Sequence, residues 1–293
     1  MNAPKTFGIW GNTEKDSFWE TLPEILSWST ENGLTAHLTT RILNHERCDQ
    51  NTCPTIQSRE DMEALDFMLV LGGDGTFLSL ARSMEHISTP ILGIHLGDLG
   101  FLAKVTRKDL FRRLTQVAEG TYEIEPRMMV ESVIQKNGDT LKHIALNDIV
   151  LSNGESHRML SATVKVNQHL VGNYRADGII VATPTGSTAY SLSAGGPIVT
   201  PAVDSLVITP ASAHSLTSRP LVVPAESTIK IEFAETKDPI LFIADGQIHE
   251  SLDSSCIVTI TKSTFAIQLI DFSDCDYFQT LRTKMGWGIR GNQ

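Results

Sequence analysis

The sequence predicts two domains: an α/β domain with a mostly parallel sheet at the N-terminus, and an all-β domain after it. Up to Gly120, short apolar runs alternate with stretches of helical periodicity, which is typical of parallel strands joined by helices. After Gly120 the helical periodicity nearly disappears, and short β-rich runs separated by turn residues continue to about Ile270. The 293 residues are 41% hydrophobic, which suits two buried cores better than one.

We expect the boundary between the domains near Glu125-Pro126, where the composition shifts. Residues 1–125 then form the α/β domain, and the tail, residues 271–293, packs back on it. Residues 126–270 form the β domain.

The expected elements of the first domain follow one another in a regular order. Four strands are predicted, each followed by a helix or a loop: Thr6–Trp10, Leu34–Leu38, Phe67–Leu71 and Pro90–Ile94. Ser58 with Asp61, and Thr106 with Asp109, have the spacing of helix caps. In sheets of this kind ligands bind at the carboxyl ends of the strands, so the residues that follow the strands are candidates for a site.

The second domain is predicted to consist of strands and tight turns. Asn137-Gly138 is a strong hairpin signal between the runs Val130–Gln135 and Ile144–Leu151. Six further runs have strand composition: Met159–Val166, Ile179–Ala182, Leu206–Thr209, Thr228–Phe233, Leu241–Ala244 and Phe265–Leu269.

A glycine cluster marks the first candidate for chemistry. The apolar run Phe67–Leu71 ends abruptly in Gly72-Gly73-Asp74-Gly75, and a segment of helical composition follows. Backbone N–H groups in such a loop can approach a phosphate closely, because glycine has no side chain. The Asp74 carboxylate would repel a phosphate unless a cation or a hydroxyl donor lies between them. The loop therefore indicates more than anion binding, and the alternative is that Asp74 only caps the helix.

Asn147-Asp148 is the second candidate. The two residues lie within an otherwise apolar run, and a buried polar side chain is costly without a partner. Adjacent strand residues point to opposite faces, so we expect the pair at a strand end or bulge where both can reach one ligand. A satisfied polar pair at the rim of a sheet is the alternative.

The third candidate is the segment from Tyr174 to Pro197. It begins with Arg175 and Asp177, passes through a buried strand and becomes a loop rich in hydroxyl groups and glycine with one aromatic residue, Tyr190. Hydroxyls and amides can bind ribose and phosphate, an aromatic ring can pack on a base, and an arginine can bind an anion. The segment therefore suits a nucleotide, although an ordinary Ser/Gly loop would have similar composition.

The overall composition excludes several classes of protein. A net charge of −10 disfavours non-specific binding to nucleic acid, so an anionic substrate needs a locally positive site or a divalent cation. No apolar run approaches the length of a membrane span and no secretory signal is evident, so we expect a cytoplasmic protein. The four cysteines form no Cys-x-x-Cys pair and are expected to be reduced.

Taken together, these motifs resemble those of bacterial NAD kinases. Four segments carry the resemblance, which runs through nearly the whole chain: Gly72-Gly73-Asp74-Gly75-Thr76, Gly93-Ile94-His95-Leu96-Gly97-Asp98-Leu99-Gly100-Phe101-Leu102, Asn147-Asp148, and Asp177-Gly178 followed by Thr183-Pro184-Thr185-Gly186-Ser187-Thr188-Ala189-Tyr190. The last segment is highly specific. The resemblance implies a C-terminal β-sandwich, and transfer of the ATP γ-phosphoryl group to the 2′-hydroxyl of the adenosine ribose of NAD, with Mg²⁺.

The resemblance also implies roles for individual residues. Asp74 would accept the proton of the 2′-hydroxyl, with Gly75 beside it, and Phe101 would line the adenine pocket. The residues that would contact NAD more directly are Asn147, Asp148, Asp177, Thr188, Ala189, Tyr190, Ser191, Leu192 and Ser193. Arg158, Arg175 and Gln247 are similar to peripheral binding positions. The family tends to form homotetramers, so we expect a tetramer or a dimer.

This chain departs from the family pattern at two positions. The usual Asn-Glu pair is Asn147-Asp148 here, one methylene shorter, and His95 stands where Asn is commoner. A lipid kinase would share the glycine loop, and a sensor that binds NAD without catalysis would need no Asp74. No Gly-x-Gly-x-x-Gly follows a strand and no P-loop motif is present, which disfavours a dehydrogenase or a P-loop NTPase.

Overall fold

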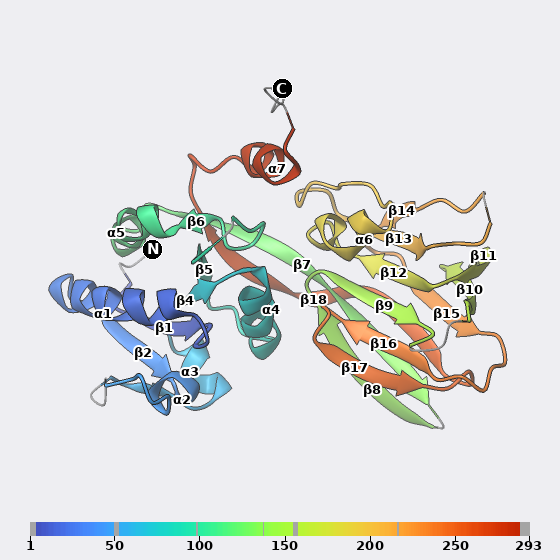
Figure 1. Cartoon of the computed structure of the whole chain (residues 1–293), viewed down its shortest axis with the longest axis horizontal. Helices are drawn as coiled ribbons and strands as arrows, with labels where there is room; N and C mark the ends of the chain where they lie inside the picture. Colours follow the sequence, from blue (N-terminus) through green and yellow to red (C-terminus); the bar gives the residue numbers. More distant parts are fainter. Residues whose placement is uncertain are drawn as a thin grey trace. The chain divides into compact units, whose positions relative to one another are not determined.

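The computed structural model describes residues 4–49, 53–97, 99–136, 138–154, 158–215 and 217–287. The chain divides into two compact units (Figure 1). Unit 1 contains Met1–Pro126 and Ile267–Gln293, and unit 2 contains Arg127–Ala266. Two long strands, β7 (Glu123–Lys136) and β18 (Ile257–Asp271), include residues of both units.

Unit 1 alternates strands and helices. In chain order its elements are β1 (Thr6–Gly11), α1 (Asp16–Glu31), β2 (Thr35–Thr39), α2 (Thr40–Leu43), β3 (Thr55–Ile56), α3 (Arg59–Glu63), β4 (Phe67–Gly72), α4 (Asp74–Ser83), β5 (Ile91–His95), β6 (Val105–Thr106), the 3₁₀ turn η1 (Arg107–Asp109), α5 (Leu110–Ala118) and α7 (Tyr277–Met285). Five of the strands form a parallel sheet in the order β5-β4-β1-β2-β3, which confirms the predicted parallel α/β architecture.

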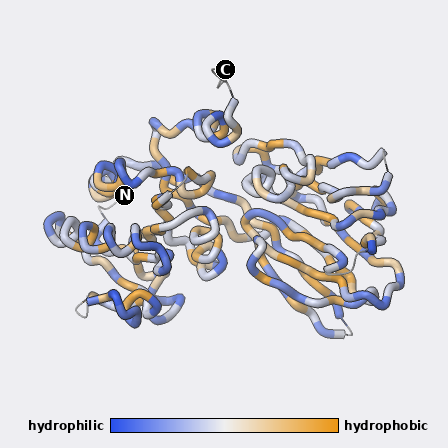
Figure 2. Tube along the Cα trace, viewed as in Figure 1, coloured by the Kyte–Doolittle hydropathy of each residue, from blue (hydrophilic) through white to orange (hydrophobic). Residues whose placement is uncertain are grey.

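The helices of unit 1 cover both faces of this sheet because its strands are apolar on both sides. Phe18, Leu22 and Ile25 of α1 share one buried cluster with alternate residues of β1, β4 and β5 and with the apolar face of α5. On the other face, α4 packs against β4 and β1. In Figure 2 the strands are the orange, hydrophobic segments of the unit. Since α1 follows β1 and α4 follows β4, the two helices leave neighbouring strands toward opposite faces.

Two helix starts have the caps that the sequence predicts. The Ser58 hydroxyl accepts from Asp61 N, and the Asp61 carboxylate accepts from Ser58 N in return, at 3.2 and 2.9 Å. The Thr106 hydroxyl accepts from Asp109 N at 3.2 Å. These local signals are read correctly because both partners lie within one turn of each other.

Unit 2 is built from strands. Its elements are β8 (Asp139–Ala145), β9 (Asp148–Ser152), β10 (Leu160–Val166), β11 (His169–Ala176), β12 (Gly178–Ala182), the 3₁₀ turn η2 (Gly186–Thr188), α6 (Tyr190–Ser193), β13 (Ser205–Ala211), β14 (Leu221–Pro224), β15 (Ile229–Phe233), β16 (Ile240–Ala244) and β17 (Ile248–Leu252). One antiparallel sheet has the order β14-β13-β12-β9-β16-β17. In the other sheet, neighbouring strands pair antiparallel in the order β11-β10-β15-β18.

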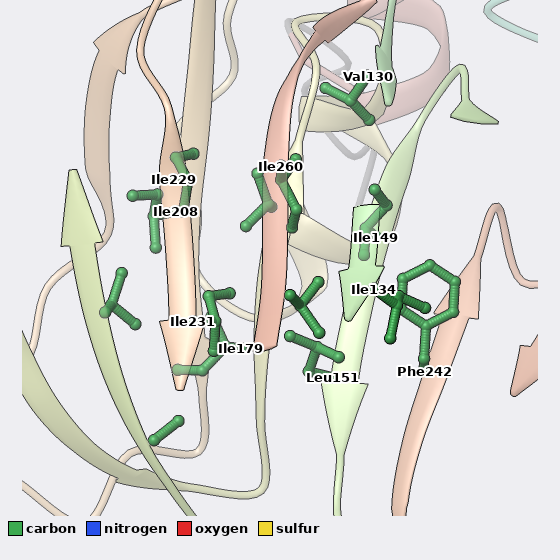
Figure 3. Close-up of a cluster of buried hydrophobic side chains, with 14 of the residues drawn as sticks. Val130, Ile134, Ile149, Leu151, Ile179, Ile208, Ile229, Ile231, Phe242 and Ile260 are labelled. Atoms are coloured by element: carbon green, nitrogen blue, oxygen red, sulfur yellow. The ribbon is translucent and has the colours of Figure 1, made fainter. Parts of the chain in front are cut away.

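The two sheets of unit 2 share one apolar core. Ile149, Ile179 and Phe242 from the first sheet lie in the same buried cluster as Ile231 and Ile260 from the second (Figure 3). Each sheet thus buries one face against the other, which is the β-sandwich that the resemblance implied.

The predicted strand Ile144–Leu151 is wrong. The chain forms two strands here, β8 and β9, and they belong to different sheets. The break falls at Leu146 and Asn147, whose backbone N–H groups donate to the Asp245 carboxylate rather than to a neighbouring strand. The hairpin partner of β7 is β8, with Lys136 opposite Asp139; Gly138 has φ +93°, and Asn137 lies outside the described residues.

Three strands of unit 2 were not predicted from the sequence: β11, β14 and β17. Their residues are mostly exposed or half-buried, so they lack the continuous apolar runs that identify buried strands. Cys48, Cys53, Cys256 and Cys275 are all free thiols, as predicted. Within the described part of the chain, no helix combines the length and the apolar character needed to span a membrane.

Candidate active site

The glycine loop of unit 1 lies between the end of β4 and the start of α4, as predicted. Gly73 is the N-cap residue and Asp74 is the first residue of the helix. Asp74 therefore lies in the first turn of the helix rather than at the N-cap. Its carboxylate accepts from the backbone N–H groups of Phe101, Leu102 and Ala103, at 2.9, 3.1 and 3.2 Å.

This contact joins two motifs that lie 27 residues apart. A Cβ on Gly100 would lie 2.1 Å from Asp74 Oδ1, so only glycine lets the loop approach the carboxylate this closely. Asp98, within the second motif, lies outside the described residues. The Phe101 ring packs near Tyr277 of α7, with a centroid separation of 6.4 Å, and Lys284 Nζ lies 5.5 Å from its centre.

His95 ends β5 directly beside Gly72 of the glycine loop. The side chain is buried, with 8% exposed, and Nδ1 lies 2.7 Å from the carbonyl oxygen of Gly97. A carbonyl only accepts, so Nδ1 donates this hydrogen bond. Nε2 is buried and has no hydrogen-bond partner among the residues that the structure describes. Nε2 can therefore make one further hydrogen bond.

In unit 2, Asp245 organises the turn that carries Asn147. Its carboxylate accepts from the N–H groups of Leu146, Asn147 and Asp148 at 2.8, 2.7 and 3.2 Å. Asp245 lies in the turn between β16 and β17, where its φ is +50°. Because three backbone donors converge on one carboxylate, the position of Asn147 depends on a residue 98 positions away in the chain.

Asp148 begins β9, so the polar pair lies at a strand end, as predicted. The residue is only 4% exposed. Burial, followed by the neighbouring charge of Asp245, raises the pKa of the Asp148 carboxyl to about 7. The backbone N–H of Tyr190 donates to this carboxyl and has the opposite, smaller effect on its pKa. Near neutral pH this carboxyl is therefore protonated in a large part of the molecules.

A cavity of about 250 Å³ opens beside this pair, and we name it the Tyr190 cavity. Its lining consists of Asn147, Asp148, Val150, Ala189, Tyr190, Ile243, Asp245 and Gly246. Tyr190 is 50% exposed, which leaves much of its ring free to contact a ligand. Four of the predicted residues, Asn147, Asp148, Ala189 and Tyr190, are thus brought together from two separate motifs.

The Thr183–Gly186 turn holds these two motifs against each other. Thr183 N donates to Asn147 O at 2.9 Å, and the Thr183 hydroxyl donates to Leu146 O at 2.6 Å. A Cβ on Gly186 would lie 2.0 Å from Asn147 O, so this position excludes every other residue type unless the backbone moves. The turn therefore sets where η2 and α6 begin relative to Asn147.

Other predicted residues have structural partners or lie elsewhere. The buried Ser191 hydroxyl pairs with Thr209 at 2.8 Å, and the Thr188 hydroxyl donates to Thr185 O. Arg158 borders a different cavity of about 150 Å³, where it pairs with Asp238 at 3.5 Å. The remaining predicted residues of unit 2 do not line the Tyr190 cavity: Arg175 and Asp177, both exposed, Leu192 and Ser193 in α6, and Gln247 in the turn after β16.

Four lining residues were not among the predicted site residues: Val150, Ile243, Asp245 and Gly246. Asp-Gly between two apolar runs is a hairpin signal, and it could have marked the turn after Leu241–Ala244. It could not have shown that the carboxylate reaches Asn147, because that contact depends on the pairing of β16 with β9.

Replacing Asp148 with Asn should make the protein more stable at pH 8 while changing its stability little at pH 4. The folded pKa of about 7 lies above the ordinary value of 3.8, so between those limits the folded state keeps a proton that the unfolded state has lost. The folded protein loses stability as the pH rises through that window, and Asn has no proton to lose. Thermal midpoints measured from pH 4 to 8, with exposed Asp139→Asn as the control, should diverge only for Asp148→Asn. A difference independent of pH would contradict the assignment.

Comparisons with known proteins place both units in one family. Residues 7–122 match the ATP-NAD kinase N-terminal domain, and residues 146–272 match the ATP-NAD kinase C-terminal domain. A protein named NAD kinase from Caldanaerobacter subterraneus subsp. tengcongensis is 38% identical over 285 residues, which cover 96% of this chain and 99% of that protein. Another NAD kinase, from Marinobacter nauticus, is 44% identical over 227 residues, 77% of each chain.

Two solved structures are similar over nearly the whole chain. An NAD kinase from Archaeoglobus fulgidus in complex with ATP has a TM-score of 0.76 and 26% identity, covering 96% of this chain and 98% of that one. Yeast NADH kinase complexed with NADH has a TM-score of 0.89, covering 99% of this chain and 89% of that one; at 24% identity this likeness concerns the fold alone.

Proposed function

The chain belongs to the NAD kinase family and uses ATP to phosphorylate NAD, and we propose that Asp74 accepts the proton of the attacking ribose 2′-hydroxyl. One observation carries this role. The Asp74 carboxylate is the acidic group at the glycine loop, and three backbone N–H groups hold it in place. A carboxylate oxygen can accept two hydrogen bonds, so Oδ2, which accepts from Phe101 alone among these three, retains capacity for a hydroxyl.

Phosphoryl transfer requires positioning and neutralisation of charge more than covalent chemistry from the protein. In the proposed reaction the 2′-hydroxyl oxygen forms a bond to the γ-phosphorus of ATP, the bond to the β-γ bridging oxygen breaks, and ADP leaves. Proton transfer to Asp74 comes late, because the transition state is loose and the hydroxyl need not be deprotonated early.

The Tyr190 cavity supports NAD binding in unit 2. The Asn147 amide can both donate and accept, so it can bind the edge of a base or a ribose hydroxyl. The Asp148 carboxyl can also donate or accept a hydrogen bond, because it gains or loses a proton near neutral pH. Gly75, Phe101 and the predicted residues outside the cavity are further proposed contacts.

Mg²⁺ is proposed to accompany ATP rather than to occupy a protein cage. Among the described residues, no three His, Cys, Asp or Glu side chains are grouped so that they could hold a metal. Mg²⁺ commonly keeps several waters and binds through substrate phosphates. Bound in that way it would neutralise charge on the triphosphate, and no protein residue is assigned to it.

Replacing Tyr190 with Ala should raise the KM for NAD about tenfold or more while kcat changes little. Removing a ring that packs on the substrate weakens ground-state and transition-state binding alike, and tenfold corresponds to about 1.4 kcal/mol. Leu170→Ala, at a side chain of unit 2 that is 62% exposed, is the control. A large fall in kcat at unchanged KM would show instead that Tyr190 acts only in the transition state.

The function is tested with purified protein, Mg-ATP and one of three acceptors: NAD, NADH or diacylglycerol. NADP formation from NAD supports the proposal, and phosphorylation of diacylglycerol would support a lipid kinase instead. Binding of NAD without any phosphorylation would favour a sensor. Size-exclusion chromatography with light scattering tests the further proposal that the protein is a homotetramer or a dimer.

A further inference from the structure

Unit 1 contains a cavity of about 410 Å³ that the proposed NAD contacts do not use. Its lining comes from the carboxyl ends of three neighbouring strands and from the helices that follow: Trp10, Gly11, Thr39, Thr40, Arg41, Ile56, Gln57, Ser58, Arg59, Met62 and Ser83. The lining therefore combines apolar residues, an indole, hydroxyl and amide groups and two arginines. A cavity of this size and composition fits a small polar molecule with a flat ring.

The position of the cavity relates it to the glycine loop. Gly11, in its lining, is paired in register with Leu71, the residue that precedes Gly72. Adjacent strands lie about 4.8 Å apart, so the edge of the cavity is one strand away from the loop. The chain also leaves β1 and β4 toward opposite faces of the sheet, and ligands of such sheets bind in the crevice outside the strand ends at that point.

Positive charge lies over the same strand ends. Lys15 follows β1, and its Nζ would be 3.9 Å from a Cβ placed on Gly97, which follows β5. Because β4 lies between β1 and β5 in the sheet, the Lys15 side chain crosses the end of β4. The acidic neighbours of Lys15 pair with other residues: Glu14 with Arg41 at 3.9 Å and Asp16 with Arg47 at 2.6 Å. Among the residues that the structure describes, neither of these carboxylates pairs with the Lys15 ammonium, which can therefore bind an anion.

We propose that this cavity binds the nucleoside of the phosphoryl donor. The nucleoside lies beside Trp10 and Arg41, and the triphosphate runs from Gly11 across the end of β4 to the glycine loop, where Lys15 offsets its charge. The inference rests on the proposed function, since it assigns the ATP side of that reaction. It separates the two nucleotides of the reaction by location, with the donor nucleoside on unit 1 and the Tyr190 cavity left to NAD.

Two variants test the cavity without removing a buried contact. Thr40 is exposed at its rim, so Thr40→Trp should partly fill it; exposed Thr35→Trp, at the amino end of β2, the strand that precedes Thr40, is the matched control. Arg41→Ala removes a guanidinium that is 61% exposed, and Arg47→Ala, outside the cavity lining, is its control. Initial rates give the KM for ATP and for NAD, and calorimetry gives the Kd of a non-hydrolysable ATP analogue.

Both cavity variants should raise the KM for ATP and the Kd of the analogue about tenfold, while the KM for NAD and the thermal midpoint stay within error of wild type. Each control should leave all four values unchanged. If the analogue binds both cavity variants as tightly as it binds wild type, the assignment of the cavity is wrong, whatever the activity. If instead the KM for NAD rises and the analogue is unaffected, the cavity belongs to the acceptor and the inference is also overturned. Failure of wild type to form NADP would count against the proposed function alone, since analogue binding still tests the cavity.

Discussion

Replacing Asp74 with Asn should lower kcat by about 10²–10⁴, the usual contribution of a positioned general base. The Asn side chain has nearly the same shape, and its single oxygen, in the position of Oδ1, can still accept from the N–H groups of Leu102 and Ala103. It cannot take the proton of the 2′-hydroxyl, and its amide would present donors where the hydroxyl also donates. NAD affinity, measured by calorimetry, should change much less than kcat.

Asp66 provides a matched control for this variant. It lies just before β4, at the opposite end of the strand from Asp74, and its carboxylate also accepts from backbone N–H groups, those of Lys5 and Thr6 at 2.8 and 2.9 Å. Asp66→Asn should lower the thermal midpoint and leave kcat unchanged. If Asp74→Asn behaves in the same way, with a lower midpoint and near-normal turnover, Asp74 is an anchor for the loop and the catalytic assignment fails.

Replacing Gly186 with Ala should weaken NAD binding at least tenfold and lower the thermal midpoint by several degrees. The new Cβ would lie 2.0, 2.3 and 2.6 Å from the O, C and Cα atoms of Asn147, and backbone atoms cannot rotate out of the way as a side chain can. Either the Thr183–Gly186 turn or the Asn147 turn must therefore move. Overpacking of this kind costs about 1–3 kcal/mol, and a displaced Asn147 would no longer line the Tyr190 cavity as it does now.

Gly172→Ala is the control for this effect. Gly172 lies in β11 of the same unit, and the nearest atom to its added Cβ would be a ring carbon of Tyr174 at 3.4 Å, an ordinary contact. The control should bind NAD as wild type does. If Gly186→Ala also binds NAD normally at a temperature where it is folded, the turn does not position the site.

Local features of the site were readable from the sequence because neighbouring residues produce them. The apolar run Phe67–Leu71 before a glycine cluster predicts a strand, a turn and a helix, and the structure confirms this order. Asn147-Asp148 was predicted at a strand end because an apolar strand cannot bury two adjacent polar side chains without partners. The hydrogen-bond partner of this segment, Asp245, could not be predicted from the sequence. For the same reason, Ile144–Leu151 was wrongly predicted to be one continuous strand.

The α/β and β architecture, the glycine loop and the family motifs can be predicted from the sequence alone, since periodicity, turn residues and short motifs are properties of contiguous segments. Which of these segments contact one another depends on the tertiary fold. Asp74 anchors the Phe101–Ala103 loop and Asp245 holds the Asn147 turn because sheet pairing brings together residues 27 to 99 positions apart. Trp10, Arg41 and Arg59 line one cavity for the same reason: the order β5-β4-β1-β2-β3 gathers the carboxyl ends of separate strands at one edge, and no local pattern in the sequence specifies that order.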